Sequence, residues 1–139
     1  MSETNKTAAE LLLEYHEKIA NYLSFDELNL KDSQMSLPSV RHYWVGRLMH
    51  HKQQIIKYKK ARDKAAKTLR QKLEHESPIG LTSKTIAESV SPDDVIQQLE
   101  EEIANQELIV EFLTKVEANL RDAQYGLNNL TKIITLETT

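Results

Sequence analysis

The stretch of this sequence best suited to binding a ligand is a run of basic residues at 57–72, KYKKARDKAAKTLRQK. Eight of its sixteen residues are Lys or Arg, and Asp63 is its single acid. Cations at this density bind phosphate groups or acidic surfaces, because each one neutralises an anion. The candidate binding residues are Lys57, Lys59, Lys60, Arg62, Lys64, Lys67, Arg70 and Lys72.

This run stands out against the rest of the chain, whose formal net charge is −3. Residues 41–72 carry eleven basic residues and one acid, so the remainder of the chain has a net charge of −13. Such asymmetry favours nucleic acid as the ligand, ahead of an acidic partner protein or an anionic membrane. The alternative is a simply solvated face, or a face balanced by acids later in the chain, such as Glu100, Glu101, Glu102, Glu107 and Glu111.

Other kinds of site have little support in the sequence. The chain has no cysteine, which excludes a disulfide, a thiolate nucleophile and a thiolate metal site. His50 and His51 are adjacent, so on a helix they point in different directions and make a poor metal site. The sequence contains no phosphate-binding Gly-rich loop, and its first residues lack a basic region followed by an apolar stretch, so we expect no signal peptide. We therefore expect a soluble intracellular protein that is not an enzyme and needs no cofactor.

The elements that position the basic run are predicted to be helices. Only three Gly and three Pro occur in 139 residues, which favours long helices in an all-α fold forming a single domain over 1–139. The basic helix should begin at Pro38, and the last helix at Ser91-Pro92, with Ser91 as its cap. We expect an N-terminal helix at 4–23, a connector at 24–37, the basic helix at 38–73, a loop at 74–90 and a C-terminal helix at 91–136.

The C-terminal helix carries a heptad seam that predicts its partner. Apolar residues recur at alternating steps of four and three, as in two helices packed side by side: Ile109, Leu113, Val116, Leu120, Ala123, Leu127, Leu130 and Ile134. We expect an antiparallel, coiled-coil-like hairpin with the basic helix. Further apolar residues exceed what one partner covers, so either the N-terminal helix or a homo-oligomer contact should bury them: Ile96, Leu99, Ile103, Leu108, Val110 and Phe112.

Two segments carry a family likeness: LNLKDSQMSLPSVRHYWVGRLMHHKQQIIKYKKA and SVSPDDVIQQLEEEIANQELIVEFLTKVEANLRDAQYGLNNLTKI. They resemble the UvsY recombination mediators of T-even-type phages and cyanophages. The likeness lies in the order of the parts: a Leu-x-x-Asp entry, Leu37-Pro38, the aromatic pair Tyr43-Trp44, the basic helix, and a Ser-x-Asp-Asp start to a long last helix.

The resemblance implies a recombination mediator that forms rings of six or seven subunits. Such a protein binds single-stranded DNA without sequence preference and loads a RecA-like recombinase onto strands coated with single-strand-binding protein, in the host-cell cytoplasm. The family's Lys-x-Arg pair is reproduced by Lys60-Ala61-Arg62, but its Tyr-Tyr-Ser-Gly is absent. The rival interpretation is a structural adaptor whose basic helix docks on an acidic protein.

Overall fold

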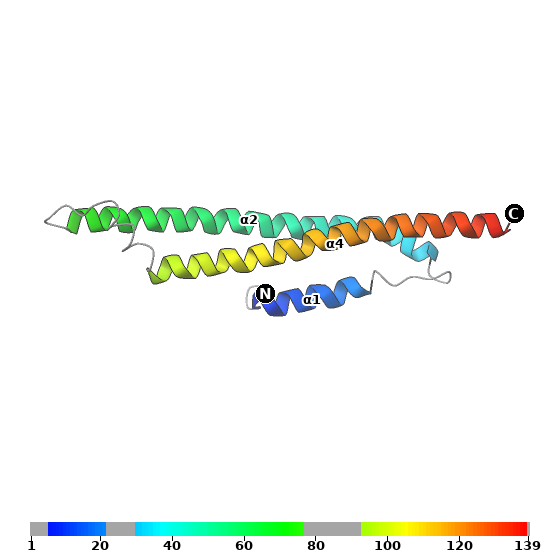
Figure 1. Ribbon diagram of the computed structural model, residues 1–139, viewed down its shortest axis with the longest axis horizontal. Coiled ribbons are helices and arrows are strands. Elements are labelled where there is room, and N and C mark those ends of the chain that lie inside the picture. Colours follow the sequence, from blue (N-terminus) through cyan, green and yellow to red (C-terminus); the bar gives the residue numbers. More distant parts are fainter. Residues whose placement is uncertain (1–5, 22–29, 77–92, 139) are drawn as a thin grey trace. The chain divides into compact units, whose positions relative to one another are not determined.

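The computed structural model describes residues 6–21, 30–76 and 93–138, and these residues form three helices. They are α1 (Ala8–Ala20), α2 (Leu30–Glu76) and α4 (Asp94–Thr138), coloured blue, cyan to green, and yellow to red in Figure 1. No strand occurs in these described ranges. The all-α fold class is confirmed.

The chain divides into two compact units, and both long helices contribute to each. The first unit comprises 1–50 and 109–139, and the second unit comprises 51–108. The basic run therefore lies in the second unit. That the whole chain forms one domain stays a prediction.

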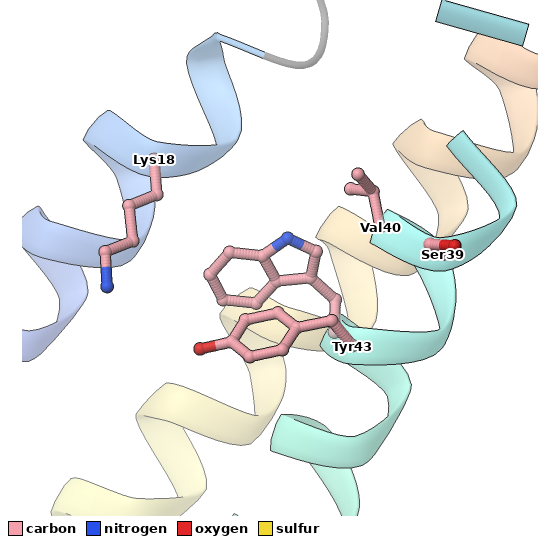
Figure 2. Close-up of a pocket in the computed structure, with 5 residues that line it drawn as sticks. Lys18, Ser39, Val40 and Tyr43 are labelled. Atoms are coloured by element: carbon pink, nitrogen blue, oxygen red, sulfur yellow. The ribbon is translucent and has the colours of Figure 1, made fainter. Parts of the chain in front are cut away.

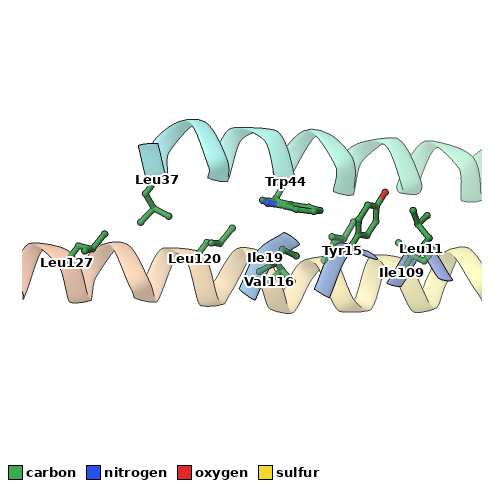
Figure 3. Close-up of a cluster of buried hydrophobic side chains, with 10 residues drawn as sticks. Leu11, Tyr15, Ile19, Leu37, Trp44, Ile109, Val116, Leu120 and Leu127 are labelled. Atoms are coloured by element: carbon green, nitrogen blue, oxygen red, sulfur yellow. The ribbon is translucent and has the colours of Figure 1, made fainter. Parts of the chain in front are cut away.

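The core of the first unit is built from all three helices, as Figure 3 shows. Its ring pair is Tyr15 of α1 against Trp44 of α2, edge to face, with centroids 5.1 Å apart. The Tyr15 hydroxyl accepts hydrogen bonds from Arg47 Nη2 (2.7 Å) and Nε (3.1 Å). The buried members are Leu11, Tyr15, Ile19, Leu37, Trp44, Ile109, Leu113, Val116, Leu120 and Leu127.

The heptad seam of the last helix is confirmed from Ile109 to Leu127, because five of its members are buried in this core and Ala123 packs against it. The two long helices are antiparallel within the first unit. Gln34 near the start of α2 donates to Thr131 Oγ1 (2.6 Å), whereas Arg41, further along, reaches back to Glu117 (3.3 Å).

Helix α1 is shorter than the expected 4–23, and it covers part of the apolar surface of α4. It begins after Thr7, whose hydroxyl accepts a hydrogen bond from the Glu10 backbone N–H (3.2 Å) and so caps the first turn. Leu11 and Ile19 are buried in the shared core. Residues 4–5 and 22–23 lie outside the described residues.

The expected start of the basic helix at Pro38 is wrong, because α2 begins at Leu30 and Pro38 lies inside it. An interior proline removes one backbone hydrogen bond and crowds the carbonyl four residues earlier, at a cost of about 3 kcal/mol. Tertiary contacts on both sides offset this cost. Leu37 and Trp44 are buried against α4, and Gln34 is hydrogen-bonded to Thr131.

The start of α4 also differs from the expected cap. Asp93 Oδ1 accepts hydrogen bonds from the backbone N–H groups of Val95 (3.0 Å) and Ile96 (3.2 Å), so Asp93 caps the helix. A carboxylate is favoured here because it also faces the positive end of the helix dipole. Ser91, Pro92 and most of the expected loop, 77–90, lie outside the described residues, while 74–76 belong to α2.

The second unit is a simpler pairing of α2 with α4. Ile96 is buried against Ala65, Ala66, Leu69 and Leu73. The buried His51 ring lies 2.7 Å from Gln106 Oε1 through its Nδ1. His51 precedes Leu69 in α2 whereas Gln106 follows Ile96 in α4, so the helices are antiparallel here too.

Candidate nucleic-acid interface

The eight candidate cations lie on the part of α2 that packs against α4 in the second unit. Residues Ala65, Leu69 and Leu73 turn toward Ile96, which fixes the orientation of the helix about its axis. With this face committed to the core, the long cationic side chains point elsewhere. All of them are exposed except Arg62, which is half-buried.

Arg62 is held by carboxylates and differs from its neighbours. Its Nε donates to Asp63 Oδ1 (3.1 Å), and its Nη1 donates to Glu100 Oε1 of α4 (3.2 Å). The hydrogen bond to Asp63, and behind it the charge of Glu100, raise the pKa of Arg62. Arg62 is therefore occupied within the chain, although it belongs to the Lys-Ala-Arg sequence that suggested a DNA contact.

The expected balancing acids neutralise only a small part of the basic run. Glu107 lies 3.9 Å from Lys59, and Glu100 pairs with Arg62. Glu111 instead pairs with Lys115 of its own helix (3.4 Å). In the part of the chain that the structure describes, the other six cations have no ion-pair partner: Lys57, Lys60, Lys64, Lys67, Arg70 and Lys72.

Four of these cations form a continuous row, which we call the lysine stripe: Lys57, Lys60, Lys64 and Lys67. Steps of three, four and three residues place them on one side of α2, opposite the side that faces Ile96. At 1.5 Å per residue the stripe is about 15 Å long. Like charges at these spacings repel, so an anion bound along the stripe relieves repulsion as well as adding attraction.

The residues expected at an oligomer contact are in different environments. Ile96 and Ile103 are buried within the chain itself, at 6% and 4% exposure. Leu99, Val110 and Phe112 are partly buried, and Phe112 packs against the first-unit core. Leu108 is 52% exposed and is the member most accessible to a second subunit. The contact itself stays a prediction.

A cavity of about 370 Å³ lies beside Tyr43 and Trp44 of the first unit. Lys18 of α1 lies across from Val40 and Tyr43 of α2, with Ser39 and Trp44 completing the lining (Figure 2). Glu14 lies 2.9 Å from Lys18, and hydrogen bonds from Lys6 and then Lys18 lower the pKa of Glu14. Because its lysine is already paired, this cavity offers little net charge to a phosphate.

A second, smaller cavity in the first unit gathers residues that the sequence interpretation did not single out. It has a volume of about 240 Å³ and is lined by Arg41, Arg121, Gln124, Tyr125 and Asn128. The only signal in the sequence is the spacing of the four residues from α4, which places them on neighbouring turns. Arg41 of α2 completes the lining. Its presence there can be predicted only if the register between the two helices is known.

The described residues contain no group of three or more His, Asp or Glu side chains that could hold a metal ion. Within the same ranges, no helix is long and apolar enough to cross a membrane.

Comparison with known proteins finds similarity in the fold. No protein-family model matches the sequence, and no curated protein matches it significantly. The structure is similar to crystal structures of the bacteriophage T4 recombination mediator protein UvsY in two lattices. One has a TM-score of 0.75 and 10% identity, covering 91% of this chain and 98% of that chain. The other has a TM-score of 0.73 and 10% identity, covering 91% and 96%. The chain thus has the fold of UvsY.

Proposed function

We propose that this protein is a recombination mediator. It binds single-stranded DNA without sequence preference and helps a RecA-like recombinase displace single-strand-binding protein from the strand. The observation that carries this proposal is the lysine stripe: four exposed lysines in one row, without ion-pair partners among the described residues, on a chain that is otherwise acidic. The shared fold with UvsY, a recombination mediator, is the second support.

The stripe suits a mediator because it recognises a backbone and not a sequence. Lysine ammonium groups neutralise phosphates, which every strand presents at regular intervals, and such contacts carry no direct information about the bases. A mediator must act wherever a strand is coated. Binding through phosphates therefore supplies the generality that this role requires.

Assembly would raise the affinity of a short stripe. One stripe offers a few contacts, but a ring of six or seven subunits presents many copies to one strand, so later contacts form at high effective concentration. The exposed Leu108, together with partly buried Val110 and Phe112, offers apolar surface for such an assembly. We propose a homo-oligomer of this size.

The test of the mediator role uses the DNA-dependent ATPase of a RecA-like recombinase on strands pre-coated with single-strand-binding protein. The wild-type protein should shorten the lag before ATP hydrolysis, and a variant with the stripe lysines changed to Ala should not. A wild-type protein that binds DNA but leaves the lag unchanged would contradict the mediator role and leave DNA binding intact.

The rival function is an adaptor whose basic helix docks on an acidic protein. It draws on the pairs Lys59–Glu107 and Arg62–Glu100, which show that this helix accepts carboxylates. Thermal unfolding separates the two functions, because only a ligand that binds the folded state raises Tm. If an acidic protein raises Tm and an oligonucleotide neither raises Tm nor competes with that protein, the adaptor function is favoured.

A further inference from the structure

The small cavity of the first unit has the dimensions of a subsite. Its volume of about 240 Å³ lies below the range of roughly 300–1,000 Å³ that is typical of pockets holding a whole ligand. It can therefore take one group of a larger molecule, such as a base, while the rest of that molecule stays outside. Its five lining residues come from α2 and α4 of the same unit.

The two arginines of the cavity differ in their hydrogen bonds and ion pairs. Arg41 donates to Gln124 Oε1 through Nη1 and to Glu117 Oε1 through Nη2 (3.3 Å), which holds it in place. Its Nε is buried and has no acceptor in the described part of the chain. Arg121 is exposed, and within the same ranges it has no ion pair. Glu117 balances Arg41, so Arg121 leaves the cavity with an unneutralised positive charge.

Tyr125 is the aromatic member of the cavity and is 63% exposed. It lies four residues after Arg121, and side chains at this spacing on a helix have Cβ atoms about 5–6 Å apart. That separation is comparable to the separation of a phosphate from its own base in one nucleotide. An exposed ring beside an unpaired guanidinium can thus stack on a base while the cation contacts the phosphate.

The carboxamides complete a lining that suits a base of any identity. The Oε1 atom of Gln124 is occupied by Arg41, which leaves its NH₂ group available as a donor. Asn128 is exposed and offers both a donor and an acceptor. Amides that supply both kinds of group can satisfy the polar edge of different bases. A simple carboxylate ligand would use Arg121 but would leave the ring and both amides without a role.

We propose that this cavity is a second contact for the same single strand, binding one nucleotide with its base on Tyr125 and its phosphate on Arg121. The inference rests on the proposed DNA-binding function but not on the lysine stripe. The stripe contacts phosphates alone, whereas the cavity adds a contact to the base. The protein should therefore distinguish a strand that has bases from one that has only the sugar-phosphate backbone.

The experiment measures the affinity of the full-length protein for an oligothymidylate and for an abasic strand of equal length, at one salt concentration. The wild-type protein should bind the base-bearing strand about tenfold more tightly, a difference of about 1.4 kcal/mol. Tyr125→Leu should remove most of that preference, and Tyr125→Phe should keep it. Tyr43→Leu is the matched control, since Tyr43 is 48% exposed on α2 and lines the other cavity.

The outcomes for the cavity and for the proposed function are distinguishable. If neither strand binds, the DNA-binding function fails. If both bind with equal affinity, or if the preference persists in a folded Tyr125→Leu variant, the cavity is not a nucleotide subsite, although DNA binding by the protein stands. Arg121→Gln should weaken binding to both strands, because it removes a phosphate contact. Unchanged affinity in that variant would also overturn the inference.

Discussion

Changing the four stripe lysines to Ala should weaken DNA binding while making the protein slightly more stable. Lys57, Lys60, Lys64 and Lys67 are all exposed, and none has an ion pair within the described ranges. Their loss therefore breaks no contact that supports the fold. Two opposite effects of one variant make this a demanding test.

The expected loss of binding follows from the number of cations. Six unpaired cations of the basic run, each neutralising one phosphate, give a slope of log affinity against log salt of about −4, at ~0.7 per phosphate for single strands. Removing four of them should flatten the slope to about −1.4 per subunit. Fluorescence anisotropy of a labelled oligonucleotide over a salt series measures both slopes.

The expected gain in stability has the same origin. The pairs 57–60, 60–64 and 64–67 place like charges three or four residues apart, and each such pair destabilises a helix by about 0.2–0.5 kcal/mol. Alanine also has the higher helix propensity. The free energy of unfolding should therefore rise by about 1 kcal/mol, which urea denaturation followed by circular dichroism can detect.

A charge-matched control separates the stripe from general electrostatics. The double variant Lys60→Ala/Lys64→Ala should lose more affinity than Lys31→Ala/Lys115→Ala, which removes two exposed lysines outside the basic run. If the quadruple variant binds with the wild-type affinity and slope, or if both double variants lose the same affinity, the stripe is not the DNA contact.

Four further predictions concern stability, DNA binding and assembly. Gly46→Ala should stabilise the protein by about 1 kcal/mol in urea denaturation, because apart from its chain neighbours and the adjoining backbone of its own helix a Cβ there meets no atom within 4 Å; a loss of stability would contradict this. Asp93→Ala should destabilise it by about 1 kcal/mol through loss of the cap, and an unchanged midpoint would argue against capping. Arg62→Ala should change the slope of log affinity for DNA against log salt less than Lys64→Ala does, because Arg62 is already paired with Glu100. An equal change would indicate that Arg62 also contacts DNA. Leu108→Asp should lower the mass seen by light scattering, and a monomeric wild type would refute the assembly.

The sequence predicted the parts of the fold that depend on regular spacing. The heptad from Ile109 to Leu127 predicted which face of α4 is buried, because its 3.5-residue periodicity does not depend on the conformation of the loops. The basic run was equally visible, because charge density needs no tertiary information. By contrast, the local rule for proline predicts a helix start at Pro38, whereas the burial of Leu37 and Trp44 that overrides it depends on residues distant in the sequence.

The parts that could not be predicted depend on the register between helices. The sequence left open whether the N-terminal helix or another subunit buries Ile96 and Ile103. Both are buried within the chain, and Ile96 packs against α2 residues 65–73, a pairing that local patterns do not specify. The small cavity is a similar case. Arg41 precedes Arg121 by eighty residues in the sequence, and only the antiparallel pairing brings Arg41 to Gln124.

We propose that the basic run of α2 contacts the backbone of single-stranded DNA. The most direct measurement is the affinity of the wild-type protein for several unrelated single strands of equal length across a salt series. We expect similar affinities at each salt concentration and a common slope of about −4. Absence of binding at low salt, a slope near zero, or affinities governed by base sequence would contradict the proposal.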